Sequence, residues 1–184
     1  MIPIPQPALA LNSSDFPTSS HYTMEHEVLV RRIIRPEAIV DMVSAAARSG
    51  RLHAVIINAH GMAGPDGVAL GTGLHLGNVH LWGAVHGLIE RIWMCACQVA
   101  DTLDGQRFCQ SLAVVTGAEV VASSDPQSVG GADREFAFDW NWRLARIPPL
   151  QIDDFEGHVM LWGPDGVVQD YAPNPTIPAP SCPT

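Results

Sequence analysis

Blocks of apolar residues alternate with polar stretches along the chain, and their spacing predicts strands and helices in turn. The run "EVLVRRII" (27–34) is typical of a strand, and "LHAVIINA" (52–59) is the short continuous apolar run expected of a central parallel strand. Between them, Pro36 suits the first turn of a helix and Gly50 its end. The apolar face of this helix would be formed by four residues at helical spacing: Ile39, Met42, Val43 and Ala46.

The pattern continues through the second half of the chain. Residues 67–77 alternate around a Gly-Thr-Gly turn and predict a hairpin, and Asn78 suits the cap of a following helix. Two more apolar strands are predicted at 91–97 and 118–124, with a helix between them that ends at Gly117. The apolar faces are Leu81, Trp82, Val85, Leu88 and Ile89 for the first of these helices, and Phe108, Leu112 and Val115 for the second.

These repeats of strand and helix predict an α/β fold, with a mostly parallel central sheet and helices on both faces. A single domain over residues 25–171 would contain it, closed by β-rich segments at 134–146 and 158–171. Residues 1–24 are rich in Pro and Ser, which predicts an extended, poorly ordered N-terminal segment, and the Pro-rich residues 172–184 predict a C-terminal tail of the same kind.

The composition narrows the class of partner. Hydrophobic residues make up 47% of the chain and charged residues 16%, which is typical neither of disorder nor of nucleic-acid binding. The net charge of −9 disfavours nucleic acids and anionic membranes and favours cationic peptides. No apolar run reaches the roughly 18 residues of a membrane span. The N-terminus lacks the basic region of a signal peptide, which predicts a cytoplasmic protein or export without a recognisable signal.

Two reactive residues stand at the carboxyl ends of predicted strands. His60 directly follows the strand at 52–59, and Cys97 closes the strand at 91–97. Sites in parallel sheets form beyond the carboxyl ends of the strands, so adjacent strands would place these two side chains face to face. The imidazole can then hold the cysteine as a thiolate nucleophile, and the N–H groups of Gly61 and Cys97 can stabilise an oxyanion.

An apolar strand ending in His60-Gly61, followed by one ending in Ala96-Cys97, resembles the caspase-like cysteine peptidases, which include the gingipains, separases and CHAT domains. Residues 53–142 are more similar still to a caspase-like domain found near the N-termini of large bacterial surface proteins. The counterparts of that family's further motifs follow in the same order: "GQRF" (105–108), "TGAEVVASSD" (116–125) and "GGADREFAFDW" (130–140).

The resemblance implies a cysteine endopeptidase that acts on a protein or peptide substrate. Cys97 would be the nucleophile and His60 the base and later the acid, a chemistry that requires no cofactor and no metal. In caspase-like enzymes, the pocket for the substrate residue before the scissile bond is commonly built from the region that corresponds to the end of the strand at 118–124. The carboxylate of Asp125 would then select Arg or Lys at that substrate position. The alternative role of this residue is to cap the turn before Pro126.

Two other functions stay open. The domain can be a catalytically silent caspase-like scaffold or binding module, or it can be a metal-binding protein. In the second case His75, His80 and His86, with Cys95 or Cys109, would supply the ligands, although their spacing matches no standard zinc signature. Outside such a site, Cys95 is expected to be an inert thiol of the core.

Overall fold

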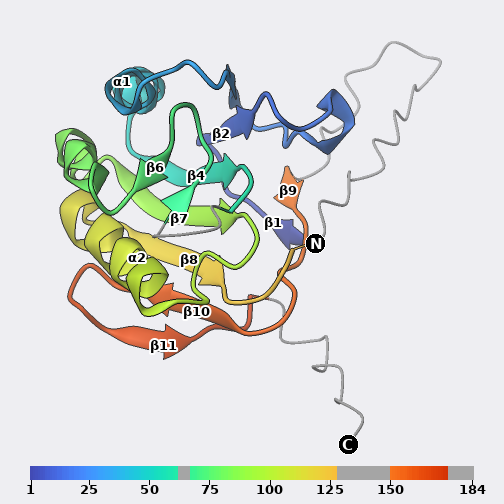
Figure 1. The fold of residues 1–184 in the computed structure, drawn as a ribbon. Helices are drawn as coiled ribbons and strands as arrows, with labels where there is room; N and C mark the ends of the chain where they lie inside the picture. The colour runs from blue at the N-terminus through green and yellow to red at the C-terminus, as the bar shows by residue number, and fades with distance from the viewer. Residues whose placement is uncertain (62–66, 128–149, 174–184) are drawn as a thin grey trace, which may run out of the picture.

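The computed structural model describes residues 1–61, 67–127 and 150–173. Its centre is a seven-stranded sheet (Figure 1) in the order β11-β10-β8-β7-β4-β2-β3. The five strands from β8 to β3 are parallel to one another, and β10 and β11 are antiparallel to their neighbours. In chain order they are β2 (Ala8–Ser13), β3 (His26–Val30), β4 (Leu52–Asn58), β7 (Ile89–Cys95), β8 (Glu119–Ser123), β10 (Val159–Trp162) and β11 (Val168–Asp170).

The helices begin and end where their local sequences direct. Helix α1 (Pro36–Ala46) has its proline in the first turn and continues into the 3₁₀ turn η2 (Ala47–Ser49). Helix α2 (Leu103–Thr116) is capped by the Thr102 hydroxyl, which accepts a hydrogen bond from the Gly105 N–H at 3.0 Å. It ends at Gly117, whose φ of 67° lies in the left-handed region that glycine adopts without strain.

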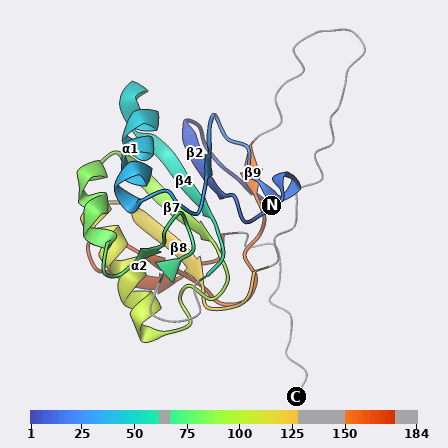
Figure 2. The ribbon, with the colours of Figure 1, turned by 45° about the horizontal axis from the view of Figure 1, so that its top comes forward.

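The predicted α/β class is confirmed, but the described helices are arranged differently from the expectation. Helices α1 and α2 both contact the 3₁₀ helix η3 (Val79–Val85), and the three cover one face of the sheet (Figures 1 and 2). The connections β3–β4, β4–β7 and β7–β8 all step across the sheet in the same direction. Because such crossovers share one handedness, they place their helices on the same face.

The opposite face of the sheet is covered by the N-terminal segment. Strand β1 (Ile2–Pro3) pairs with β9 (Gln151–Ile152), and Ile2, Ile4 and Tyr22 bury their side chains against this face. The 3₁₀ turn η1 (Thr18–Ser20) lies in the connection from β2 to β3.

The prediction of a poorly ordered segment over residues 1–24 is therefore wrong. Strand β2 lies inside the sheet, between β3 and β4, and all six of its residues are buried. None of its residues is charged, so both faces of the strand can be buried without burying an unpaired charge. The neighbouring prolines flank the strand and do not interrupt it.

Two further local expectations can be compared with the structure. The predicted hairpin is present as β5 (Gly67–Val68) and β6 (Leu74–His75). The helix after Asn78 is 3₁₀ rather than α, and the Asn78 side chain bonds the hairpin instead of capping it. The predicted segment 134–146 lies outside the described residues, and so does the predicted tail 172–184 apart from its first two residues.

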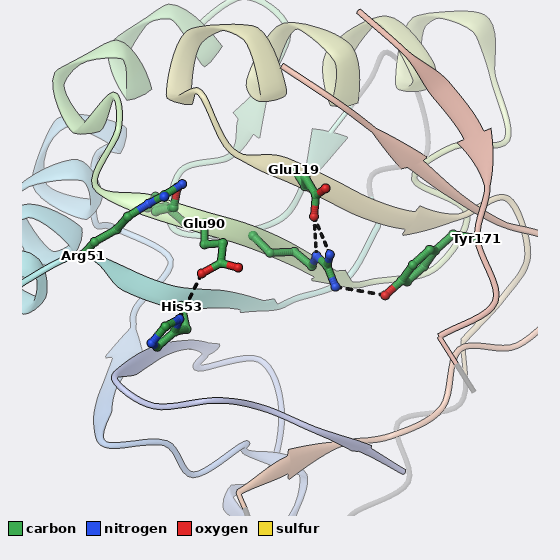
Figure 3. Close-up of polar contacts among 7 residues, drawn as sticks. Arg51, His53, Glu90, Glu119 and Tyr171 are labelled. Atoms are coloured by element: carbon green, nitrogen blue, oxygen red, sulfur yellow. Dashed lines mark hydrogen bonds and ion pairs between the residues drawn. The ribbon is translucent and has the colours of Figure 1, made fainter. Parts of the chain in front are cut away.

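On the face of the sheet opposite the helices, a polar network joins the end of the last described strand to β7 and β8 (Figure 3). Arg91 of β7 donates through Nε to Glu119 of β8 at 2.8 Å and through Nη1 to the Tyr171 hydroxyl at 2.9 Å. The same guanidinium lies over the rings of Trp93 and Tyr171, 5.4 Å and 5.5 Å from their centroids. No helix among the described residues has the length and hydropathy to cross a bilayer.

Candidate active site

The structure brings the two reactive loops together at the carboxyl edge of the sheet. Strands β4 and β7 are neighbours, with Asn58 opposite Cys95 in the parallel register. His60 and Cys97 each lie two residues beyond this pair, so the loops that carry them leave the sheet side by side. The adjacency predicted for the two strands is thus present.

Gly61 lies directly against the Cys97 loop. A Cβ atom built on Gly61 would be 1.9 Å from the carbonyl oxygen of Cys97 and 3.0 Å from its carbonyl carbon. Any side chain at this position would force the two loops apart. Gly61 also forms an isolated bridge with Val68, in which the His60 carbonyl accepts a hydrogen bond from the Ala69 N–H at 2.8 Å.

The sulfur of Cys97 is partly exposed and contacts the backbone of Gln127. The Gln127 N–H donates to Sγ at 3.3 Å, and Sγ–H donates to the Gln127 carbonyl at 3.3 Å. The loop after β8 is attached to the loop of Cys97 by a second bond, in which the Gln98 N–H donates to the Asp125 carbonyl at 3.0 Å.

The imidazole of His60 packs on an aromatic ring and is exposed to solvent. Its centroid lies 4.3 Å from that of Phe16, and the ring planes are inclined by 52°. Between His60 and Cys97, both of which are described, there is no hydrogen bond. The sequence contained no periodic signal that would place Phe16, a residue of the β2–β3 connection, at this site.

Asp125 reaches the site with its backbone, while its carboxylate holds a turn. Oδ2 accepts hydrogen bonds from the His158 N–H at 2.8 Å and the Ser124 hydroxyl at 3.0 Å. These bonds, chiefly the one from His158, hold the pKa of Asp125 below its usual value. A Cβ on Gly157 would lie 2.2 Å from the Asp125 carboxyl carbon, so the turn closes tightly on this side chain. The carboxylate thus holds the turn at Gly157 and His158, which is a different turn from the one before Pro126 that the sequence suggested.

A small pocket lies beside the Cys97 loop. The Tyr22 hydroxyl donates to Asp153 Oδ2 at 3.0 Å in its wall. Burial raises the pKa values of Tyr22, Asp153 and the Cys95 thiol above their ordinary range, so Cys95 is held as an unreactive thiol. The lining residues are Tyr22, Asn58, Cys95, Gln127, Asp153, Asp154 and Phe155.

Asn58, which lines this pocket, and its neighbour Asn12 are fully buried, and the orientations of their amides follow from their hydrogen bonds. Asn12 exchanges two hydrogen bonds with the backbone of Tyr22, at 2.9 Å and 3.0 Å, which fixes its Oδ1 as the acceptor. Asn58 Nδ2 donates to that Oδ1 at 2.9 Å and to the Ser20 carbonyl at 2.8 Å. The amide oxygen of Asn58 therefore points away from both, and it has no partner among the described residues.

The candidate metal ligands are dispersed. His75 Nδ1 accepts a hydrogen bond from the Gly77 N–H, His86 bonds the Val115 carbonyl, and Cys109 is on the buried side of helix α2. Within residues 1–61, 67–127 and 150–173, no group of three or more His, Cys, Asp or Glu side chains is placed to hold a metal ion.

No protein-family model matches this chain, and neither a curated protein nor a solved structure matches it.

Proposed function

We propose that this protein is a cysteine endopeptidase with Cys97 as the nucleophile and His60 as the general base and acid. The observation that carries the proposal is the close approach of Gly61 to the carbonyl of Cys97, which joins a His-Gly loop and a Cys loop at one edge of the sheet. A histidine and a partly exposed cysteine at adjacent strand ends are the parts that thiol catalysis requires.

In the first step His60 takes the proton of the Cys97 thiol, and the sulfur forms a bond to the carbonyl carbon of the scissile peptide. The developing oxyanion accepts hydrogen bonds from the N–H groups of Gly61 and Cys97. His60 then donates its proton to the leaving amine as the C–N bond breaks, which leaves an acyl-enzyme. Water, deprotonated by His60, attacks the acyl carbon and restores the thiol.

The resting geometry requires one rearrangement before this chemistry. The His60 ring must leave Phe16 and turn towards the sulfur, and the Sγ–H must leave the Gln127 carbonyl. Catalytic hydrogen bonds are often long or misaligned in free enzymes and tighten when substrate binds. Because the imidazole is exposed, a side-chain rotation meets little resistance from packing.

The same observation favours a second candidate, a catalytically silent module that binds peptides. A peptide acyloxymethyl ketone separates the two, because it alkylates only an activated cysteine. Labelling of the native protein that disappears in Cys97→Ala and persists in Cys95→Ala and Cys109→Ala supports the peptidase. Labelling that is absent, or that is equal at all cysteines, overturns it in favour of the silent module.

A further inference from the structure

We infer that the pocket beside Cys97 binds a basic side chain, arginine in preference to lysine, of the residue that precedes the scissile bond. The inference rests on the proposed function and assigns the substrate class of the same site. It moves the recognition of the basic residue from Asp125, whose carboxylate caps a turn, to Asp153 and Asn58.

The first support is the unpartnered amide oxygen of Asn58. The residue is fully buried and lines the pocket, and both hydrogens of its Nδ2 are used in the wall. A buried carbonyl without a donor is uncommon in proteins, and it is satisfied when a ligand brings an N–H group to it. The described residues therefore leave this oxygen without a donor.

The second support is the charge of the lining. Asp153 lines the pocket with a carboxylate that receives one described donor, the Tyr22 hydroxyl. Asp154 is engaged in an ion pair with the α-amino group of Met1. No Arg, Lys or His lines the pocket in the described part of the chain. The α-amino group of Met1 acts on Asp153 but is paired with Asp154, so one cation faces two carboxylates. A cationic side chain in the pocket would balance the remaining negative charge.

The third support is the position of the pocket relative to the nucleophile. Gln127 lines the pocket and bonds Sγ of Cys97 through its backbone, and Asn58 and Cys95 lie two residues before His60 and Cys97. A substrate whose scissile carbonyl reaches Sγ therefore has one side chain beside the pocket mouth.

Arginine fits the lining better than lysine because of its shape. Its planar guanidinium presents five N–H donors in a fork, enough to serve the Asn58 oxygen and the Asp153 carboxylate together. Tyr22 and Phe155 contribute aromatic rings to the lining, and a guanidinium packs on such rings more readily than an ammonium does.

The test compares fluorogenic peptides that differ only in the residue before the scissile bond: arginine, lysine or citrulline. Citrulline keeps the length and the planar end group of arginine but has no charge. We expect kcat/KM to be at least about tenfold higher for arginine than for citrulline, because a partly buried charge pair contributes that much or more. Equal rates for arginine and citrulline in the native protein overturn the inference without any variant.

The variant Asp153→Asn then tests whether Asp153 causes the preference for arginine over citrulline. This change keeps the size of the side chain and an oxygen for Tyr22, and it should remove the advantage of arginine over citrulline. Asp125→Asn and Asp104→Asn, an exposed carboxylate on α2, should preserve that advantage. A preference lost in Asp125→Asn and kept in Asp153→Asn overturns the inference and returns recognition to Asp125.

A binding experiment separates this inference from the peptidase proposal. Calorimetric titration of Cys97→Ala with the arginine and citrulline peptides measures the affinity of each peptide without requiring turnover. Tighter binding of the arginine peptide, abolished by Asp153→Asn, supports the pocket even if the native protein hydrolyses nothing. Hydrolysis with no charge preference leaves the peptidase standing and overturns the pocket.

Discussion

The backbone of Gly61 and the carbonyl of Cys97 are in contact, with no space between them for a side chain. Through this contact the two loops that carry the candidate base and nucleophile have a defined separation. The same contact makes the site sensitive to a single added carbon atom.

Gly61→Ala should reduce peptide cleavage at least about a hundredfold, because an added Cβ would stand 1.9 Å from the Cys97 oxygen and push the loops apart. Steady-state kinetics with the arginine peptide measures the effect. Gly83→Ala is the matched control, since a Cβ there meets only the Val115 carbonyl oxygen at 4.0 Å. Unchanged kinetics in Gly61→Ala would show that the two loops need not touch for catalysis.

Asp125→Asn should lower the melting temperature in a pH-dependent way. The folded-state pKa is depressed, so the carboxylate contributes stability that is present above its unfolded pKa of about 4 and is lost as pH falls through the lower folded value. The difference from the native protein should therefore be constant near neutral pH and shrink in acid. Melting curves from pH 7 to pH 3 test it, with the exposed Asp41→Asn as the control. A difference that grows in acid would refute the assigned sign.

Arg91→Ala should destabilise the protein by about 1–3 kcal/mol, because the side chain both bonds Glu119 and packs between the rings of Trp93 and Tyr171. Urea unfolding at neutral pH measures the change. Arg107→Ala removes an exposed pair with Asp104 on α2 and should cost less than about 0.5 kcal/mol. Equal losses in the two variants would mean that the packing of Arg91 adds nothing.

Leu11→Ala should cost about 2–5 kcal/mol, because this β2 side chain is fully buried in the core beneath the helices. Deletion of residues 1–13 should prevent folding, since it removes a strand from the middle of the sheet. Chemical denaturation provides the measurement, and Ile33→Ala, whose side chain is 79% exposed, is the control. A near-neutral Leu11→Ala would contradict the assigned strand.

Elements with local sequence signals could be predicted before the structure was known. The continuous apolar run at 52–59 forms β4, and the run at 91–97 overlaps β7 and carries Cys97 just past its end. Helix α2 has its cap and its terminal glycine within its own sequence. Local periodicity and turn chemistry decide such elements, so they can be predicted without knowing their neighbours.

The surroundings of the candidate site depend on contacts between distant segments. Strand β2 is flanked by prolines, and its burial depends on the strands placed on either side of it. Phe16 reaches His60 from the connection after that strand.

The pocket likewise collects residues from distant parts of the chain, among them Tyr22, Asn58, Gln127 and Asp153. None of these residues has a distinctive signal in its own segment. The amide nitrogen of Asn58 donates to Asn12 and Ser20, and this arrangement leaves the amide oxygen without a donor among the described residues. Non-local register and hydrogen-bond satisfaction are properties of the assembled sheet, and no sequence window contains them.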